Sequence, residues 1–408
     1  LPIVLLGLGV VPLLFLPETG AAAAAESVVY VAPDGNDGWS GRLSKPTADG
    51  NDGPLATVEA AVRAARREDA TKPRRIVVHQ GEYYLAGPID LGPADSGLGI
   101  EAADGAKPVL YGGRRLDGWR ADGEVFWAVD LPEVESRQWD FRMLVVNGRL
   151  CPRARLPKEG HFTHSSEFPV PWMSTTGGGW KRKPTHEELT TMNYRPEDLG
   201  PDLDVPSAEV TVFHMWDESV VGVAENDTQN HRLRFSNPCG HPPGAFGVKK
   251  YVVWNVREGM TEPGQWYLDR SAGKAVYWPL PGEEMSGAKA LAPTMESILR
   301  IRGTEQKPVR DVNVRGLTLS VTNTPLVAGG FGAGKFPGAV ELEHAAGCKL
   351  DRLAIHNVAG QGIRAWSLED CTIENCHVHD TGACGLKFGG RCTVRDNHVH
   401  HVGRIYPS

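Results

Sequence analysis

The fold is decided by a stretch that occurs three times near the end of the chain: CKLDRLAIHNVA (348–359), CTIENCHVHDTG (371–382) and CTVRDNHVHHVG (392–403). Aligned on their first cysteines, the copies repeat apolar residues and a histidine at the same offsets, and each closes on Ala or Gly. Their starts are one coil length of a parallel β-solenoid apart. Because one coil cannot bury its own apolar residues, successive coils must stack at roughly 4.7 to 4.9 Å. We therefore predict an all-β solenoid.

A second strand follows the turn in each coil, at GAVELE (338–343), GIRAW (362–366) and GLKFG (385–389). Alternation with a period of two residues directs one set of side chains into the coil and the other set outward. An earlier coil at 312–319 fits the same frame, with a long loop at 322–337 before the next strand. The predicted outward residues of these strands are Glu341, Glu343, Arg364, Trp366 and Lys387.

Composition favours an ordered, turn-rich protein and argues against nucleic-acid binding. The 408 residues are 41% hydrophobic and include 48 Gly and 30 Pro. The formal net charge is −7, and Lys and Arg are dispersed rather than clustered. A nucleic-acid-binding surface needs a basic cluster, so no such partner is expected.

The first 25 residues have the pattern of a secretory signal. An apolar run at 3–16 leads through Pro17 and Gly20 into a row of alanines, but the charged start and the initial Met are missing. We predict a partial signal peptide at 1–25 and a mature protein from about Glu26, secreted or periplasmic and free of the membrane. A short membrane anchor is the alternative, although the run is too short to span a bilayer comfortably.

The cysteines are expected to be buried thiols. Cys348, Cys371, Cys376 and Cys392 fall on inward columns of the repeat, where a cysteine behaves as a small hydrophobe. A bridge between Cys371 and Cys392 is the alternative. The spacings match no zinc motif.

Three regions are predicted within the mature chain. Residues 26–112 hold a strand, a helix at 58–67 that Thr57 caps, and the first coils, with the helix as a lid on the first coil. Residues 113–297 lose the coil period and read as an inserted β-rich domain, with a strand at 141–147 and the clearest hairpin at 266–278. Its tryptophans are either core or sugar platforms. Residues 298–408 return to coils. The last coil has no lid, so we expect the natural protein to continue beyond residue 408.

Several motifs spread over nearly all of the mature chain resemble glycoside hydrolase family 141 and related pectate-lyase-like exported proteins. They are YVAPDGND (30–37) with WSG (39–41), DGPLAT (52–57), YGG (111–113), LVVNGR (144–149) with RAR (153–155), EPGQWYLD (262–269) and HHVGRIY (400–406). The resemblance implies a right-handed parallel β-helix that hydrolyses plant-type polysaccharides with carboxylates on its outer face. It also implies further coils, with at least one of those carboxylates in them.

A glycosidase needs two carboxyl groups about 5 to 5.5 Å apart for retention, or about 6.5 to 9.5 Å apart for inversion. Glu341 shares an outward column with Arg364 and Lys387, which favours an ionised nucleophile or base; a surface charge ladder is the alternative. Asp380 follows His379 at the exit of a strand, where a turn-capping role is the alternative. We take Glu341, Asp380 and His379 as the candidate catalytic residues.

The candidate substrate-binding residues are Arg364, Trp366, Lys387, His400 and His401. Trp366 points outward beside Arg364 and could stack on a sugar or pack on the protein surface. The histidines form two outward columns, His356–His379–His400 and His377–His398. Three roles would explain stacked imidazoles: structural packing, sugar contact or metal binding. Of these we predict packing or sugar contact, and no metal.

Together these features predict an exported, monomeric carbohydrate-active enzyme, a glycoside hydrolase without a cofactor, whose partner is a polysaccharide or oligosaccharide. The first alternative is a polysaccharide lyase, with Arg364 and Lys387 as base and charge neutraliser and Ca²⁺ as a cofactor. The second is a non-catalytic carbohydrate-binding protein on the same fold.

Overall fold

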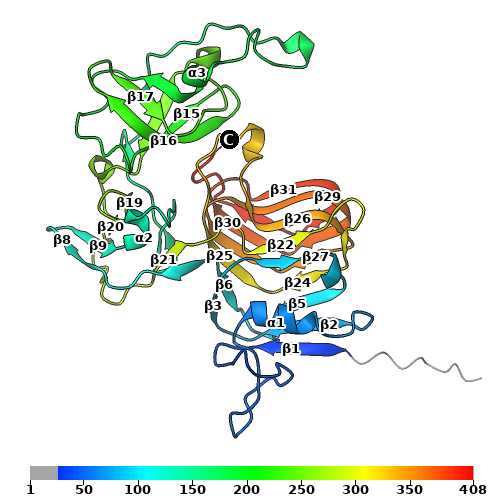
Figure 1. The fold of residues 1–408 in the computed structure, drawn as a ribbon. Coiled ribbons are helices and arrows are strands. Elements are labelled where there is room, and N and C mark those ends of the chain that lie inside the picture. The colour runs from blue at the N-terminus through cyan, green and yellow to red at the C-terminus, as the bar shows by residue number, and fades with distance from the viewer. Residues whose placement is uncertain (1–25, 408) are drawn as a thin grey trace, which may run out of the picture.

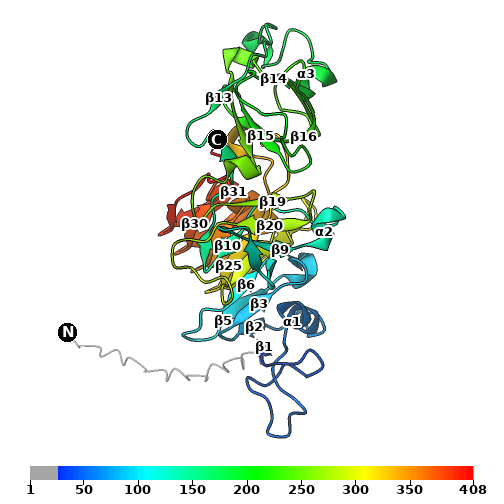
Figure 2. The ribbon, with the colours of Figure 1, turned by 90° about the vertical axis from the view of Figure 1, so that its left-hand side faces the viewer.

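The structure is a computed structural model that describes residues 26–407 (Figures 1 and 2). The predicted signal at 1–25 lies outside the described residues. Within the described range, no helix has the length and apolar character needed to cross a membrane.

Two long parallel sheets contain the strands of the predicted coils. The first sheet has the order β1 (Ser27–Val31), β2 (Arg74–Val78), β5 (Leu98–Ala102), β24 (Asn313–Arg315), β27 (Lys349–Asp351), β29 (Gln361–Glu374), β26 (Gly338–Ala346), β22 (Leu299–Arg302) and β4 (Ile89–Leu91), with β23 (Val309–Arg310) and β31 (Leu386–Arg395) beside this path. The second sheet has the order β3 (Glu82–Tyr84), β6 (Val109–Tyr111), β25 (Thr318–Thr322), β28 (Ala354–Val358), β30 (His377–Thr381) and β32 (His398–His400). Figure 1 shows early and late strands stacked in one column, although the middle of the chain separates them in sequence.

The strand register confirms the repeat. Ile355 pairs with Val378, and Val378 with Val399, on the second sheet. The outward column is confirmed too, since Glu341 pairs with Arg364 and Arg364 with Lys387. The inward residues make one continuous core that runs from Val29 to Val378. The loop predicted at 322–337 lies between β25 and β26.

The coils turn at columns of residues with a left-handed backbone. Val321, Asn357, Asp380 and His401 follow one another on neighbouring coils with φ between 49° and 65°. Asn, Asp and His tolerate this conformation better than most residues, which explains their recurrence at this offset. The turn-capping role weighed for Asp380 stays a prediction, because the printed contacts of its carboxylate are to the His379 and Arg404 side chains. Just beyond it, a Cβ on Gly382 would lie 1.9 Å from the Ala359 carbonyl oxygen, so the stacking requires glycine there.

The helix α1 (Val58–Ala65) covers the first coil, as predicted. The Thr57 hydroxyl caps it by accepting a hydrogen bond from the Ala60 amide at 3.1 Å. Its buried residues join the core of the coils, and it packs on β1 and β2. The helix thus closes the apolar interior at the N-terminal end of the stack.

The middle of the chain forms three antiparallel sheets. The first joins β11 (Arg149–Leu150), β10 (Val145–Val146), β21 (Ala290–Pro293) and β7 (Gly113–Arg115). The second joins β19 (Trp266–Asp269), β20 (Lys274–Tyr277), β9 (Phe126–Asp130) and β8 (Arg120–Asp122). The third joins β12 (Arg155–Leu156), β18 (Lys250–Trp254), β15 (Glu209–Phe213), β16 (Glu218–Asp227), β17 (Arg232–Phe235) and β14 (Thr191–Asn193), with β13 (Phe162–Thr163) at β18.

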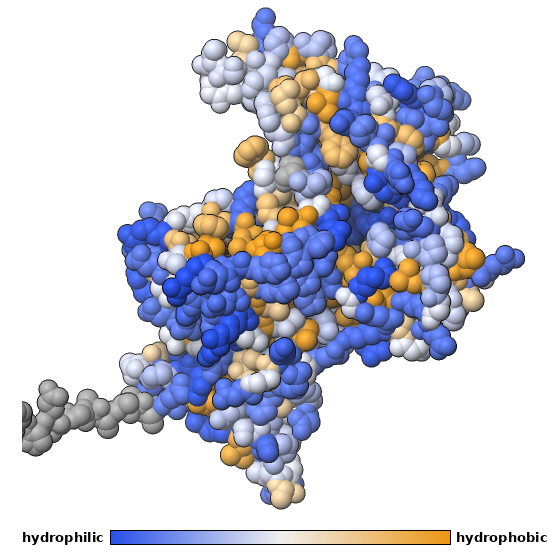
Figure 3. Space-filling view, turned by 180° about the vertical axis from the view of Figure 1, so that it is seen from behind, coloured by the Kyte–Doolittle hydropathy of each residue, from blue (hydrophilic) through white to orange (hydrophobic). Residues whose placement is uncertain are grey.

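The short helices α2 (Pro132–Glu135) and α3 (His186–Thr190) complete this part. The hairpin predicted at 266–278 is confirmed by the pairing of β19 with β20. The strand expected at 141–147 is reduced to β10. The division of the chain at residues 113 and 298 stays a prediction. Figure 2 shows the third sheet as an upper lobe above the coils, and Figure 3 shows a hollow between that lobe and the hydrophobic upper end of the stack.

All seven cysteines are free thiols. Cys348, Cys371 and Cys376 are buried inside the coils, as predicted, and Cys392 packs against the same core while partly exposed. Cys371 pairs in register with Cys392 without a bridge between them.

Candidate functional site

The predicted site residues fall into two groups on different sheets. Glu341, Arg364, Trp366 and Lys387 lie on β26, β29 and β31 of the first sheet. The second group, on and just after β30 and β32 of the other sheet, consists of His379, Asp380, His400 and His401. The structure therefore brings Asp380 together with histidines, and it places Glu341 on a separate surface.

The Glu341 carboxylate is engaged in contacts within the protein. Its side chain is 5% exposed, forms an ion pair with Arg302 and accepts a hydrogen bond from the Gly338 amide at 3.2 Å. In the same column, Lys387 donates to the Gly332 carbonyl oxygen in the long loop. These contacts match the charge-ladder alternative for Glu341, and its catalytic role stays a prediction.

Trp366 lies against the next coil. A Cβ on Gly389 would be 2.7 Å from the Trp366 ring, so the indole lies close over this glycine. The Trp366 Nε1 and the Arg364 Nε are buried without a hydrogen-bond partner among the described residues. Packing of the ring on the coil surface is thus the contact that the structure shows.

Asp380 sits in a cavity of about 300 Å³ where the coils meet the antiparallel sheets. Its Oδ2 is 2.8 Å from the His379 Nδ1, and its Oδ1 accepts from Arg404 at 3.1 Å. Burial opposes ionisation, but the hydrogen bonds from His379 and Arg404 outweigh it and lower the pKa of Asp380. The cavity therefore presents an ionised carboxylate.

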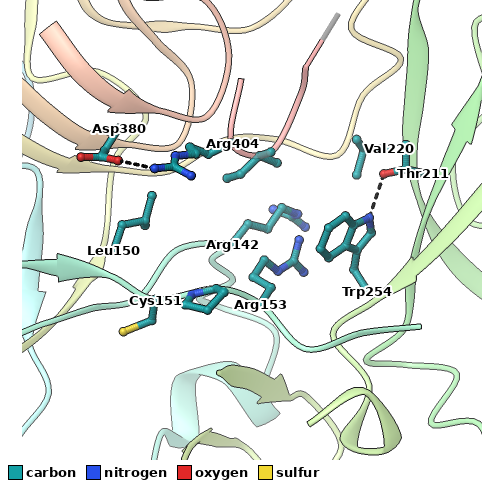
Figure 4. Close-up of a pocket in the computed structure, with 11 residues that line it drawn as sticks. Arg142, Leu150, Cys151, Arg153, Thr211, Val220, Trp254, Asp380 and Arg404 are labelled. Carbon is teal, nitrogen blue, oxygen red and sulfur yellow. Dashed lines mark hydrogen bonds and ion pairs between the residues drawn. The ribbon is translucent and has the colours of Figure 1, made fainter. Parts of the chain in front are cut away.

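The opposite wall of this cavity is cationic and aromatic. Figure 4 shows the guanidinium groups of Arg142 and Arg153 side by side between Trp254 and the Asp380–Arg404 pair. Trp254 is fixed by a 2.9 Å hydrogen bond from its Nε1 to the Thr211 hydroxyl. An aromatic ring next to a few directed polar groups is the usual lining of a small-molecule site.

A buried ion network holds the two arginines. Glu209 is 0% exposed and pairs with Arg142 at 3.1 Å, Arg153 at 2.7 Å and Arg270 at 2.5 Å. Asp140 completes the network with 2.6 and 2.7 Å contacts to Arg142 and Arg270. Burial opposes ionisation of Glu209, yet the three guanidinium groups lower its pKa. Three cations against two carboxylates leave one positive charge, and the Arg153 Nε is buried with no hydrogen-bond partner among residues 26–407.

The histidine columns are stacked, as the structural alternative predicts. The rings of His356 and His379 are 5.1 Å apart, and those of His379 and His400 are 4.9 Å apart, with interplanar angles of 12° and 5°. Burial lowers the pKa of His356 to about 4, so this ring is neutral at pH 7. His400, which is half-buried, ends this column, and the exposed His401 follows it in the chain; both stay candidates for sugar contact.

A second cavity, of about 250 Å³, was not predicted from the sequence. Its lining includes Trp216, Asp217, His241 and Phe331. Burial raises the pKa of Asp217, and its Oδ1 is buried without a partner in the described part of the chain. The residues come from β-turns and a loop with no periodic pattern; the pair Trp216–Asp217 is the signal that could have marked it.

Comparisons with known proteins support the fold. No protein-family profile and no curated protein matches the sequence. Among solved structures, one described as "Glycoside hydrolase" is 21% identical, with a TM-score of 0.73, over 93% of this chain and 74% of that chain. A second, described as XylC with xylose, is 14% identical with a TM-score of 0.46 over 92% of this chain and 54% of that chain. The first likeness shows that this chain has the fold of a solved glycoside hydrolase; the second is too distant to carry an argument.

Proposed function

We propose that this chain is an exported carbohydrate-active enzyme that hydrolyses a glycosidic bond of a plant-type polysaccharide in the Asp380 cavity. One observation carries the proposal: an ionised carboxylate faces a fixed tryptophan and two arginines across a cavity at the junction of coils and antiparallel sheets. The fold likeness to a glycoside hydrolase and the sequence resemblance to family 141 support it. We assign the coils to a right-handed parallel β-helix on the same grounds.

The lowered pKa of Asp380 suits a nucleophile or a general base rather than an acid. His379 and Arg404 hold the carboxylate in place, so both are positioning residues in this scheme. Trp254 would stack on a sugar ring, and Arg142 and Arg153 would donate hydrogen bonds to its oxygens. A glycosidase also needs a carboxylic acid with a raised pKa, and Asp217 in the second cavity has a pKa that burial raises.

The lyase alternative has less support. It requires a cation held by several carboxylates next to a base on the outer face. Glu341, the acid closest in register to Arg364, is instead paired with Arg302. Among the described residues, the group of donors close enough to share a metal consists of histidines.

Product analysis tests the proposal. The chain is incubated with a panel of plant polysaccharides, and reducing ends and ultraviolet absorbance are followed with and without chelator. Hydrolysis predicts new reducing ends that are insensitive to chelator, without the ultraviolet absorbance of unsaturated products. Unsaturated, chelator-sensitive products would establish the lyase, and sugar binding without cleavage would establish a binding protein.

A further inference from the structure

Four imidazoles form a grid on the outer face of the last two coils. His377 and His379 point outward from β30 around the inward Val378, and His398 and His400 do so from β32. The rings of His377 and His398 are 4.9 Å apart with an interplanar angle of 2°. Parallel stacking at one coil spacing therefore fixes two histidines directly above two others.

The four rings are not equivalent. The Nδ1 of His379 is hydrogen-bonded to the Asp380 carboxylate at 2.8 Å. The remaining three, His377, His398 and His400, each place one ring nitrogen so that these atoms all lie within 4.8 Å of one another. The Nε2 atoms of His377 and His400 are 2.8 Å apart. Three lone-pair donors thus converge on one point.

This spacing fits a tetrahedral metal ion. Zinc binds imidazole nitrogen at about 2.0 to 2.1 Å, which separates two ligand nitrogens by roughly 3.3 Å in a tetrahedron. That value lies between the shortest contact here and the 4.8 Å limit of the group, so small ring rotations would satisfy it. His377 and His398 are exposed, which leaves the point open to solvent and to a water ligand.

His401, which lies outside the four-ring grid, supports the same arrangement by contacting the other ring nitrogen of His400. The Nδ1 of His401 lies 2.5 Å from the Nδ1 of His400. A neutral imidazole carries one N–H, so His400 can donate from Nδ1 to His401 while its Nε2 lone pair faces the converging nitrogens. Such a hydrogen bond behind a ligand fixes the tautomer and orientation of metal-binding histidines.

We propose that His377, His398 and His400 form a three-histidine site for a divalent transition metal such as Zn²⁺, with solvent as the fourth ligand. Neutral imidazoles favour Zn²⁺, Ni²⁺ or Cu²⁺ over Ca²⁺ and Mg²⁺. The metal ties β30 to β32 and so secures the last two coils. This proposal departs from the expectation of no metal stated above, and it does not depend on the proposed hydrolysis.

Calorimetric titration of the whole chain with ZnCl₂ tests the site, with Co²⁺ absorption as a second readout. We expect one ion per chain, strong visible bands of tetrahedral Co²⁺, and a higher melting temperature with Zn²⁺. His398→Ala should weaken binding at least 100-fold, and His401→Ala about 10- to 100-fold, the usual effect of losing a partner behind a ligand. His161→Ala, which removes an exposed histidine of the antiparallel part, should leave binding unchanged.

Cu²⁺ electron paramagnetic resonance on the unaltered chain keeps the test independent of how the variants fold. Hyperfine splitting from three imidazole nitrogens is the expected result. Absence of a stoichiometric site, fewer than three nitrogens, or Zn²⁺ binding that survives His398→Ala would overturn the proposal.

Discussion

The Asp380 carboxylate is held from two directions, by its neighbour His379 and by Arg404 from the turn after β32. Its backbone is left-handed, with φ of 49°, which points the side chain out of the strand and into the cavity. The same conformation is tolerated by asparagine, and Asn357 occupies the equivalent position one coil earlier. The turn chemistry and the candidate catalytic role therefore coexist at one residue.

Removing Arg404 should change the pH dependence of activity. Arg404 is one of two donors that lower the pKa of Asp380, so Arg404→Gln should raise this pKa. If the reaction needs ionised Asp380, activity falls as the pH drops through that pKa. We expect the acidic limb of the pH–rate profile to move to higher pH in the variant, with a similar rate on its plateau. An unchanged limb would show that Asp380 does not control it.

At the scale of the element, each coil depends on its interior ladder. Ile355 is 0% exposed and lies between Leu319 and Val378 of the neighbouring coils. These columns could be predicted because a fixed coil length forces the same residue type to recur at the same offset. The sequence locates the loop at 322–337 along the chain, but the loop has no period from which its position in space could be predicted. Its contacts with Lys387 were therefore not predicted.

Ile355→Ala should destabilise the coils strongly. Truncation of a buried isoleucine typically costs about 2 to 5 kcal/mol because a cavity remains. The matched control is Val402→Ala in the turn after β32, where the side chain is 46% exposed and a change within about 0.5 kcal/mol is expected. Denaturant unfolding measures both. Equal effects would mean that the interior ladder does not carry the stability of the stack.

At the scale of the molecule, the candidate site exists because the antiparallel sheets pack against the coils. Arg142 donates to the Thr324 carbonyl oxygen of the long loop at 2.9 Å, and Asn323 donates to the Asp140 carbonyl oxygen at 2.7 Å. These contacts join residues more than 180 positions apart. Sequence patterns with short periods carry no signal for such pairs, so Arg153 and Asp217 could not be assigned to cavities beforehand, nor Glu209 to the ion network. RAR (153–155) is one of the motifs that carry the family resemblance, but the resemblance assigns no role to Arg153.

The Glu209 network should be essential for this junction. Glu209→Gln leaves three buried guanidinium groups opposite a single carboxylate, and breaking a buried pair costs about 3 to 5 kcal/mol. Glu225→Gln is the control, because Glu225 forms an exposed pair with Arg234. Thermal unfolding should show a large loss for the first variant and almost none for the second. Equal melting temperatures would contradict the role given to the network.

The most direct test of the account compares Asp380→Asn with Asp370→Asn in the release of reducing ends. Both aspartates have a left-handed backbone that asparagine accepts, with φ of 49° and 52°, so both variants should fold. Asp370 is exposed and paired with Arg391, away from the cavity lining. The account predicts a loss of at least about 1,000-fold in hydrolysis for Asp380→Asn, with sugar binding retained, and full activity for Asp370→Asn. Equal hydrolysis by both variants would contradict a catalytic Asp380.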